Sequence, residues 1–129
     1  MKNMLDKVDL QVDRIESRAC LLHSPLVSVL MTTFNHERFI AQALDGILMQ
    51  EVEFPYEVVI GEDKSTDRTR EIVCEYQRMH PDKIRLRLSK ENLYSQGLKP
   101  GWGVLHACRG KYIALCEGDD YWTDPLKLQ

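Results

Sequence analysis

Apolar runs and amphipathic stretches alternate along most of the chain. Short runs rich in β-branched and aliphatic residues predict four strands, over residues 27–31, 56–61, 84–88 and 111–116. Apolar residues at helical spacing predict helices over 36–49 and 66–79, and a glycine-containing loop leads into a short helix that ends near Cys108. This alternation predicts an α/β domain with a mostly parallel sheet and helices on both of its faces.

The first two dozen residues carry a different pattern. Apolar side chains recur there at spacings of three and four residues: Leu5, Val8, Val12, Ile15, Ala19 and Leu22. We therefore expect an amphipathic helix over residues 1–24, ahead of a domain that spans 25–129. Two roles are open for its apolar stripe: docking on the chain's own domain, or pairing with the same helix of another copy in a homo-oligomer.

The composition is that of an ordinary globular protein, with 43% hydrophobic and 29% charged residues. A net charge of −3 and a pI near 5.8 argue against nucleic-acid binding, and the densest basic segment, 83–87, alternates with apolar residues as a half-exposed strand does. The four cysteines show no metal-binding spacing. No leader or membrane-spanning run occurs, so we expect a cytoplasmic protein with at most peripheral membrane association.

Two groups of acidic residues directly follow predicted strands: Glu62 and Asp63 in the first, and Glu117, Asp119 and Asp120 in the second. In an open α/β sheet ligands bind outside the carboxyl ends of the strands, and Mg2+ takes oxygen ligands from carboxylates and substrate phosphates. The pattern indicates chemistry on a nucleotide diphosphate. The local signal also leaves a plainer role open for each group, as helix-initiating acids or as a solvated turn.

Three motifs lie at the boundaries of the predicted elements. They read VSVLMTTFNHERFIAQAL at the first strand, VVIGEDKSTDRT at the second and GKYIALCEGDDYWTDPLKLQ at the fourth. With these motifs in this order, the chain resembles, over roughly residues 25–129, the nucleotide-sugar-binding half of glycosyltransferase family 2. The members of that family are inverting enzymes of the Rossmann-like GT-A fold. The resemblance implies transfer of a sugar from a nucleotide-diphospho-sugar donor, with a family preference for UDP.

The resemblance also implies which residues bind the nucleotide. Thr32, Phe34 and Asn35 match the loop that touches it. Phe34 stands in the position of an aromatic ring that stacks on the base, a role that suits an aromatic face. Asp63 matches the acid that hydrogen-bonds the base edge or the ribose.

The metal site is implied in the same way. Asp119 and Asp120 match the DxD-type acids, which hold the ribose and a divalent metal, Mn2+ or Mg2+, between the two phosphates; Asp119 is thus assigned to the nucleotide and the metal, and Asp120 to the metal. Such a metal neutralises the charge that develops on a departing diphosphate. Glu117 stands where the motif has its first aspartate. Lys64 stands where the family has glycine, so we expect a less permissive backbone there.

Three expectations concern neighbouring residues. Ser65 or Thr66 is expected to cap the helix that follows the second strand. His36 is expected at a helix start, in a capping or surface role, because none of the four histidines has metal-ligand spacing. The segment 92–103, with its glycines and a proline, is expected to be a flexible loop that can close over the diphosphate.

In the family that the chain resembles, the catalytic base and most acceptor contacts lie beyond the metal motif. The chain stops at Gln129, so we expect a C-terminally truncated piece that binds donor without transferring sugar to a saccharide or lipid-linked acceptor. Two other functions stay open. One is a non-catalytic nucleotide-sugar-binding module; the other is a nucleotidyltransferase, although the first loop lacks the glycine-rich phosphate motif of such enzymes.

Overall fold

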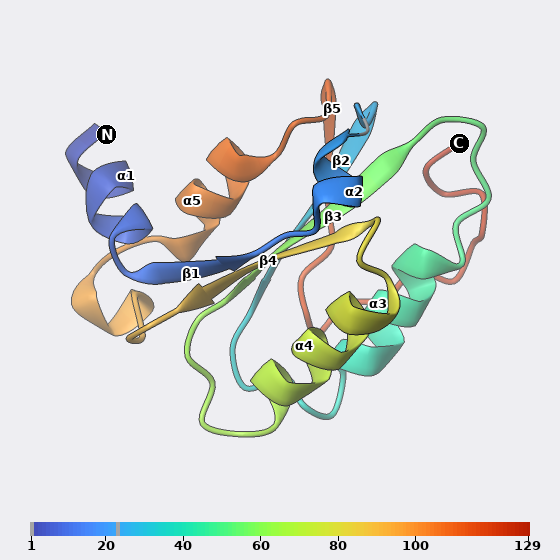
Figure 1. Ribbon diagram of the computed structural model, residues 1–129. Helices are drawn as coiled ribbons and strands as arrows, with labels where there is room; N and C mark the ends of the chain where they lie inside the picture. The colour runs from blue at the N-terminus through green and yellow to red at the C-terminus, as the bar shows by residue number, and fades with distance from the viewer. Residues whose placement is uncertain (1, 23) are drawn as a thin grey trace.

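The computed structural model describes residues 2–22 and 24–129. Its centre is a five-stranded sheet in the order β1-β4-β3-β2-β5 (Figure 1). The parallel strands are β2 (Val27–Thr33), β3 (Tyr56–Glu62), β4 (Ile84–Ser89) and β5 (Tyr112–Leu115). β1 (Val12–Ile15) lies antiparallel to β4 at one edge. Each of the four predicted strands is confirmed, with small shifts at the ends.

Helices cover both faces of the sheet, as predicted (Figure 1). α3 (Ile40–Leu48) and α4 (Thr69–Met79) pack on one face, and α5 (Pro100–Ala107) packs on the other beside α1 (Lys2–Asp9). The connections contain α2 (Arg18–Leu22) and a 3-10 turn, η1 (Tyr94–Gln96). α3 and α4 begin later than predicted, because the polar residues before them form hydrogen bonds between loops. Every helix within the described residues is too short or too polar to cross a membrane.

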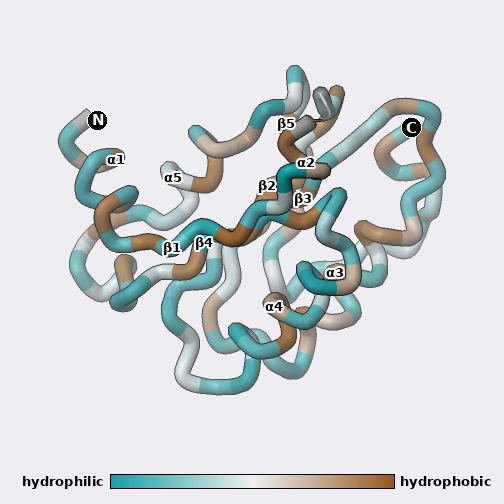
Figure 2. Tube along the Cα trace, viewed as in Figure 1, coloured by the Kyte–Doolittle hydropathy of each residue, from teal (hydrophilic) through white to brown (hydrophobic). Residues whose placement is uncertain are grey.

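The main core lies between α3, α4 and one face of the sheet. Alternate residues of the strands point into it, and these are fully buried: Val29, Met31, Val58, Ile60, Ile84 and Leu86. The helices contribute Ile40, Leu44, Ile47 and Val73. A smaller apolar cluster on the α5 face contains Leu30, Val59 and Val104. In Figure 2 the connection between β3 and α4 is hydrophilic, in contrast to the strands that it follows.

The single helix predicted over residues 1–24 is wrong, because the segment forms α1, then the edge strand β1, then α2. Two buried arginines on β4 explain the difference. Arg87 pairs with Asp9 at the end of α1, and Arg85 pairs with Glu16 after β1 at 2.8 Å. A single continuous helix could not place both carboxylates beside β4 and also form backbone hydrogen bonds with that strand. Both ion pairs matter because buried charges without partners are costly. These pairs also make β4 fully buried rather than half-exposed.

The apolar stripe of α1 docks on the chain's own domain, the first of the two roles considered for it. Val8 is 1% exposed and lies against Gly103 of α5. Leu10 and Ile15, which continue the chain past the helix, are exposed. Only the start of the predicted stripe therefore functions as a helical packing face.

Ser65 and Thr66 do not cap α4, contrary to the expectation. The carboxylate of Asp67 accepts hydrogen bonds from the backbone N–H of Thr69 at 2.9 Å and from its hydroxyl at 2.6 Å. Burial opposes the charge of Asp67, but these hydrogen bonds outweigh it and lower the pKa of that carboxyl. Ser65 and Thr66 are instead engaged by the loop that follows β2.

Lys64 has a left-handed backbone, with a φ of 60°. Residues with a Cβ adopt this conformation at a cost of about 1–2 kcal/mol. The expectation of a more restricted backbone at this position is therefore wrong, because Lys64 adopts the left-handed conformation that glycine adopts freely. The strain lies directly after Asp63, at the point where the chain turns away from β3.

Replacing Lys64 with glycine is expected to raise the free energy of unfolding by about 0.5–1 kcal/mol. Relief of the left-handed strain outweighs the extra entropy that glycine gives the unfolded chain. Urea denaturation measures the change. Lys64→Ala is the matched control, because it removes the same side chain and keeps the Cβ; equal stability of the two variants would contradict the argument.

A buried ionic cluster closes the amino end of the sheet. Glu57, near the start of β3, is 2% exposed, and its carboxylate accepts hydrogen bonds from the Ser28 hydroxyl at 2.7 Å, the Arg109 backbone N–H at 2.8 Å and the Arg85 guanidinium at 3.1 Å. Burial alone raises the pKa of Glu57, but these partners outweigh it and lower the pKa overall. The Arg109 guanidinium also donates to carbonyls of α2, so the cluster ties the N-terminal segment to the sheet.

The Glu57 cluster predicts a specific sensitivity to acid. Because its folded pKa lies below the ordinary value of 4.5, the stability that Glu57 contributes is present above that pH and is lost as the pH falls through the folded pKa. Glu57→Gln is expected to cost about 3–5 kcal/mol at neutral pH, since Arg85 keeps Glu16 but Arg109 loses the carboxylate that it pairs with. In this variant the free energy of unfolding should also fall less steeply as the pH is lowered.

Urea denaturation at a series of pH values measures both effects, with the exposed Glu53→Gln as control. If wild type and Glu57→Gln lose stability equally below pH 4.5, Glu57 is not the group responsible.

Candidate functional site

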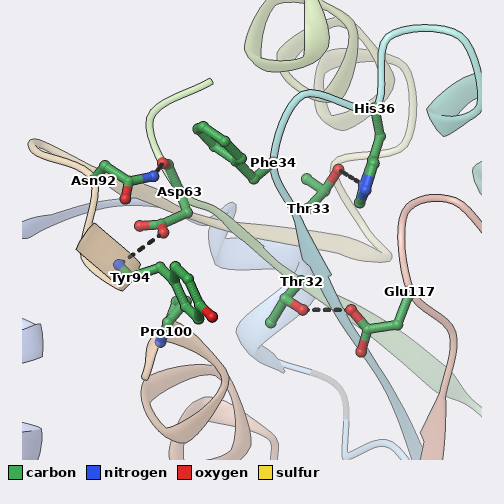
Figure 3. Close-up of a pocket in the computed structure, with 9 residues that line it drawn as sticks. All are labelled: Thr32, Thr33, Phe34, His36, Asp63, Asn92, Tyr94, Pro100 and Glu117. Carbon is green, nitrogen blue, oxygen red and sulfur yellow. Dashed lines mark hydrogen bonds between the residues drawn. The ribbon is translucent and has the colours of Figure 1, made fainter. Parts of the chain in front are cut away.

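A cavity of about 320 Å³ opens at the carboxyl ends of β2 and β3. The segment after β4 and the start of α5 form its other side (Figure 3). Its lining residues are Thr32, Thr33, Phe34, His36, Asp63, Asn92, Tyr94, Pro100 and Glu117. Of the residues predicted to form the site, Thr32, Phe34 and Asp63 line the cavity, whereas Asn35, Asp119 and Asp120 lie outside the lining.

The end of β2 holds both acidic turns by backbone hydrogen bonds. On one side, the N–H of Asp63 donates to the carbonyl of Thr33 at 3.1 Å. On the other side, the N–H of Cys116 donates to Leu30 at 3.1 Å and the N–H of Gly118 donates to Thr32 at 3.2 Å. Pairing therefore continues past the ends of β3 and β5, and it fixes the two acidic groups on either side of β2.

Asp63 is an acidic residue that is only 3% exposed. One carboxylate oxygen accepts the backbone N–H of Leu93 at 2.7 Å, and the other accepts the N–H of Tyr94 at 3.1 Å. The side-chain amide of Asn92 donates to the carbonyl of Asp63 at 2.7 Å. Asp63 thus fastens the segment after β4 to the end of β3 rather than initiating α4, which begins at Thr69.

Phe34 and Tyr94 border the cavity from opposite sides in Figure 3, with Asp63 between them. Phe34 follows the end of β2 and is 42% exposed, so its ring is available to a ligand. At the other end of the cavity, the Thr32 hydroxyl donates to a carboxylate oxygen of Glu117 at 2.5 Å. The cavity therefore has an aromatic end and an acidic end.

Asn35 has its side chain in a bridge between two loops. It adopts a left-handed backbone with a φ of 54°, which asparagine tolerates well. Its side-chain oxygen accepts the backbone N–H of Thr66 at 2.8 Å, and its own N–H donates to the hydroxyl of Ser65 at 3.0 Å. Asn35 thereby fixes the loop that carries Phe34.

The second acidic turn concentrates negative charge at the surface. The N–H of Asp120 donates to the carbonyl of Glu117 at 3.0 Å, which closes the turn, and the side chain of Asp119 is 53% exposed. Burial, and next the charges of Asp120 and Glu117, raise the pKa of the neighbouring Cys116 thiol to about 11. Cys116 therefore stays protonated at neutral pH.

His36 contributes to the site in a way that the sequence did not predict. Its carbonyl accepts N–H groups at the start of α3, as expected of a residue at a helix start. Its ring, however, lines the cavity, with Nδ1 2.9 Å from the Thr33 hydroxyl and Nε2 3.9 Å from a carboxylate oxygen of Asp119. The one signal for this role was its position in the same strand-end loop as Phe34.

The donor set at this turn suits a hard divalent cation that is shared with a ligand. Within residues 2–22 and 24–129, no three His, Cys, Asp or Glu side chains converge closely enough to hold a metal by themselves. Asp119 and Asp120 are exposed carboxylates beside the cavity, and Mg2+ is commonly bound by one or two carboxylates together with substrate phosphates and water. The residues present fit such a metal.

Residues 28–129 match the family described as glycosyl transferase family 2. The chain belongs to this family. It is 48% identical over 103 residues to an uncharacterized protein of Mycobacterium tuberculosis, and this match covers 79% of the chain but only 29% of that relative. The chain thus spans less than a third of the relative's length.

Solved structures agree with the family assignment. The chain resembles TarS of Staphylococcus aureus, crystallised in complex with UDP, with 30% identity and a TM-score of 0.66 over 79% of this chain and 29% of that one. It also resembles a mannosyltransferase of Pyrobaculum calidifontis in complex with GDP-Man and Mn2+, with 26% identity and a TM-score of 0.60 over 80% and 30%. The predicted GT-A fold is confirmed.

Gly118 is the residue that allows the acidic turn to approach β2 closely. A Cβ at this position would lie 2.3 Å from the Thr33 hydroxyl oxygen and 2.7 Å from Nδ1 of His36. Gly118→Ala is therefore expected to lower the free energy of unfolding by about 1–3 kcal/mol, as overpacking does. Gly101→Ala is the control, because its Cβ would meet Thr32 at an ordinary 3.6 Å. Equal stability of the two variants in urea denaturation would refute this account of the turn.

Proposed function

We propose that this chain is the donor-binding part of a glycosyltransferase that uses a nucleotide-diphospho-sugar, with UDP as the nucleotide. The observation that carries the proposal is the position of the two acidic turns, which β2 holds on either side of one cavity. The aromatic and acidic ends of that cavity suit the base and the diphosphate of one ligand. The complexes of TarS with UDP and of the mannosyltransferase with GDP-Man and Mn2+ support this function.

At the aromatic end, Phe34 stacks on the base in this proposal. Asp63 keeps acceptor capacity for the base edge or the ribose, because a carboxylate has about four lone-pair sites and the backbone N–H groups of Leu93 and Tyr94 occupy two. Thr32, at the acidic end, borders the ribose, which lies between the base and the diphosphate. Asn35 contributes through the loop that it holds, by fixing the position of Phe34.

At the acidic end, Asp119 and Asp120 hold Mn2+ or Mg2+ together with the diphosphate, and Asp119 also reaches the ribose. When bound, the metal supplies charge neutralisation to the departing diphosphate without proton transfer. Glu117, hydrogen-bonded to Thr32, shapes the wall beside this group and keeps the turn close to β2.

Transfer with inversion requires a base within about 3 Å of the acceptor hydroxyl. The acids at this cavity already have roles: Asp63 holds the segment after β4, Glu117 holds Thr32, and Asp119 and Asp120 bind metal. We therefore place the base outside residues 1–129, in agreement with the much greater length of the relatives. The acceptor is proposed to be a saccharide or a lipid-linked molecule.

Metal-dependent nucleotide binding tests this function. Mn2+ together with UDP at a hundredfold excess over the dissociation constant is expected to stabilise the chain by about 2.7 kcal/mol, measured as an increase in melting temperature. Asp119→Asn and Asp120→Asn should each remove most of the increase that depends on Mn2+, because each loses an anionic oxygen ligand. The fold should remain intact, since both side chains are exposed.

Asp82→Asn, at an exposed acid near the opposite end of the sheet, serves as the control and should respond like wild type. Equal Mn2+-dependent shifts in all four proteins would rule out the assigned metal ligands. Failure of UDP, GDP and dTDP alike to bind wild type would rule out the donor-binding function.

A further inference from the structure

The segment between β4 and α5 contains an ordered turn over residues 92–98. Its anchor is Leu93, which is fully buried and whose carbonyl accepts the N–H groups of Gln96 at 3.0 Å and Leu98 at 3.1 Å. Asn92 accepts the N–H of Ser95 at 2.8 Å, and Gly97 closes the turn with a left-handed φ of 75°. This part of the predicted flexible loop therefore has a defined shape.

Asp63 fixes this turn relative to β3. Its two carboxylate oxygens accept the N–H groups of adjacent residues, Leu93 and Tyr94, and no other side chain holds the N–H of Tyr94 within the described residues. A charged acceptor gives stronger hydrogen bonds than a neutral one. Asp63 directly follows β3 and is only 3% exposed, so it holds the turn against the end of the sheet.

This geometry places Tyr94 at the mouth of the cavity. Leu93 is fully buried, whereas the next residue, Tyr94, is 79% exposed and still lines the cavity. Figure 3 shows its ring across the cavity from Phe34. Exposed aromatic rings on two separate segments that face one cavity are typical of a binding surface for a flat ring.

We propose that Tyr94 is the second aromatic wall of the base subsite, so that the base lies between Phe34 and Tyr94, and that Asp63 is the positioning residue that holds Tyr94 there. This inference rests on the proposed donor-binding function. Stacking accepts any base, because every base has a π-face. The two rings therefore give affinity for the base, and the identity of the base is selected by polar groups elsewhere in the cavity.

Calorimetric titration of the 129-residue chain with UMP and with ribose 5-phosphate tests the second wall. Loss of base stacking weakens binding by about 5- to 150-fold, so Tyr94→Ala and Phe34→Ala should each weaken UMP in this range. Both should leave ribose 5-phosphate, which has no base, within about twofold. Tyr94→Phe keeps the ring and should bind UMP like wild type. Tyr112→Ala, an exposed tyrosine on β5, is the matched control.

The outcomes separate the inference from the function on which it rests. If wild type binds neither UMP nor UDP, the donor-binding function fails. If wild type binds UMP and Phe34→Ala weakens it, but Tyr94→Ala does not, the second wall is refuted and the function stands. An equal loss of UMP and ribose 5-phosphate affinity in Tyr94→Ala would also refute it, because Tyr94 would then act on the sugar phosphate.

The positioning role of Asp63 has its own test. Asp63→Ala should speed hydrogen exchange at the amides of Leu93 and Tyr94 in the absence of ligand, and Asp63→Asn, which keeps one acceptor oxygen, should restore part of the protection. Asp63→Ala should weaken UMP by a larger factor in the wild-type background than in the Tyr94→Ala background, where only the direct contact of Asp63 with the base edge or ribose remains to be lost. Equal losses in both backgrounds would show that Asp63 acts independently of Tyr94 and would overturn this part of the proposal.

Discussion

The backbone pairing at the carboxyl end of β2 is the constraint on which the site depends. Among the described residues, β2 is the only strand that lies between two parallel strands, β3 and β5, each of which is followed by an acidic turn. The last carbonyls of β2 accept N–H groups from both turns. Parallel strands begin at one edge and end at the other, so the acids of separate segments arrive together without long connections. The buried cluster around Glu57 fixes the opposite end of the same strands. The strands are thereby fixed at both ends, by the buried ionic cluster at their amino ends and by the backbone pairing beside the cavity at their carboxyl ends.

The central strands β2 and β3 were predictable because they are short, rich in β-branched residues and nearly fully buried, and such runs differ clearly from the amphipathic segments between them. The N-terminal segment was not predictable in this way. Apolar residues at three- and four-residue spacing occur there, yet the segment is shaped by long-range partners: Asp9 for Arg87 and Glu16 for Arg85. Local periodicity carries no information about an ion pair across about seventy residues of chain. The error arose from tertiary contacts that override local pattern.

The residues of the site likewise fall into those that the sequence could place and those that it could not. Thr32 lies at the end of β2, and Phe34 and Asp63 directly follow β2 and β3, so a correct sheet was enough to bring them to one cavity. His36 and Tyr94 were missed because their places depend on individual side-chain hydrogen bonds, to Thr33 in one case and to Asp63 in the other. Asn35 shows the converse: its position beside the cavity was predictable, but its left-handed backbone turns the side chain to a neighbouring loop. Residues on strand ends are thus easier to place than residues on turns.

The bridge between the loops after β2 and β3 has a consequence for movement in the molecule. Besides the contacts of Asn35, the N–H of His36 donates to the Thr69 hydroxyl at 2.8 Å and the N–H of Glu37 donates to Asp67 at 3.2 Å. Two connections that are separate in the sequence are therefore joined by several hydrogen bonds ahead of α3 and α4. A ligand cannot enter by parting them without breaking several hydrogen bonds at once. Any opening of the cavity that leaves these hydrogen bonds intact must come from the third connection, 92–98, which is held through Asp63, Asn92 and the buried Leu93 and carries Tyr94 at the mouth of the cavity.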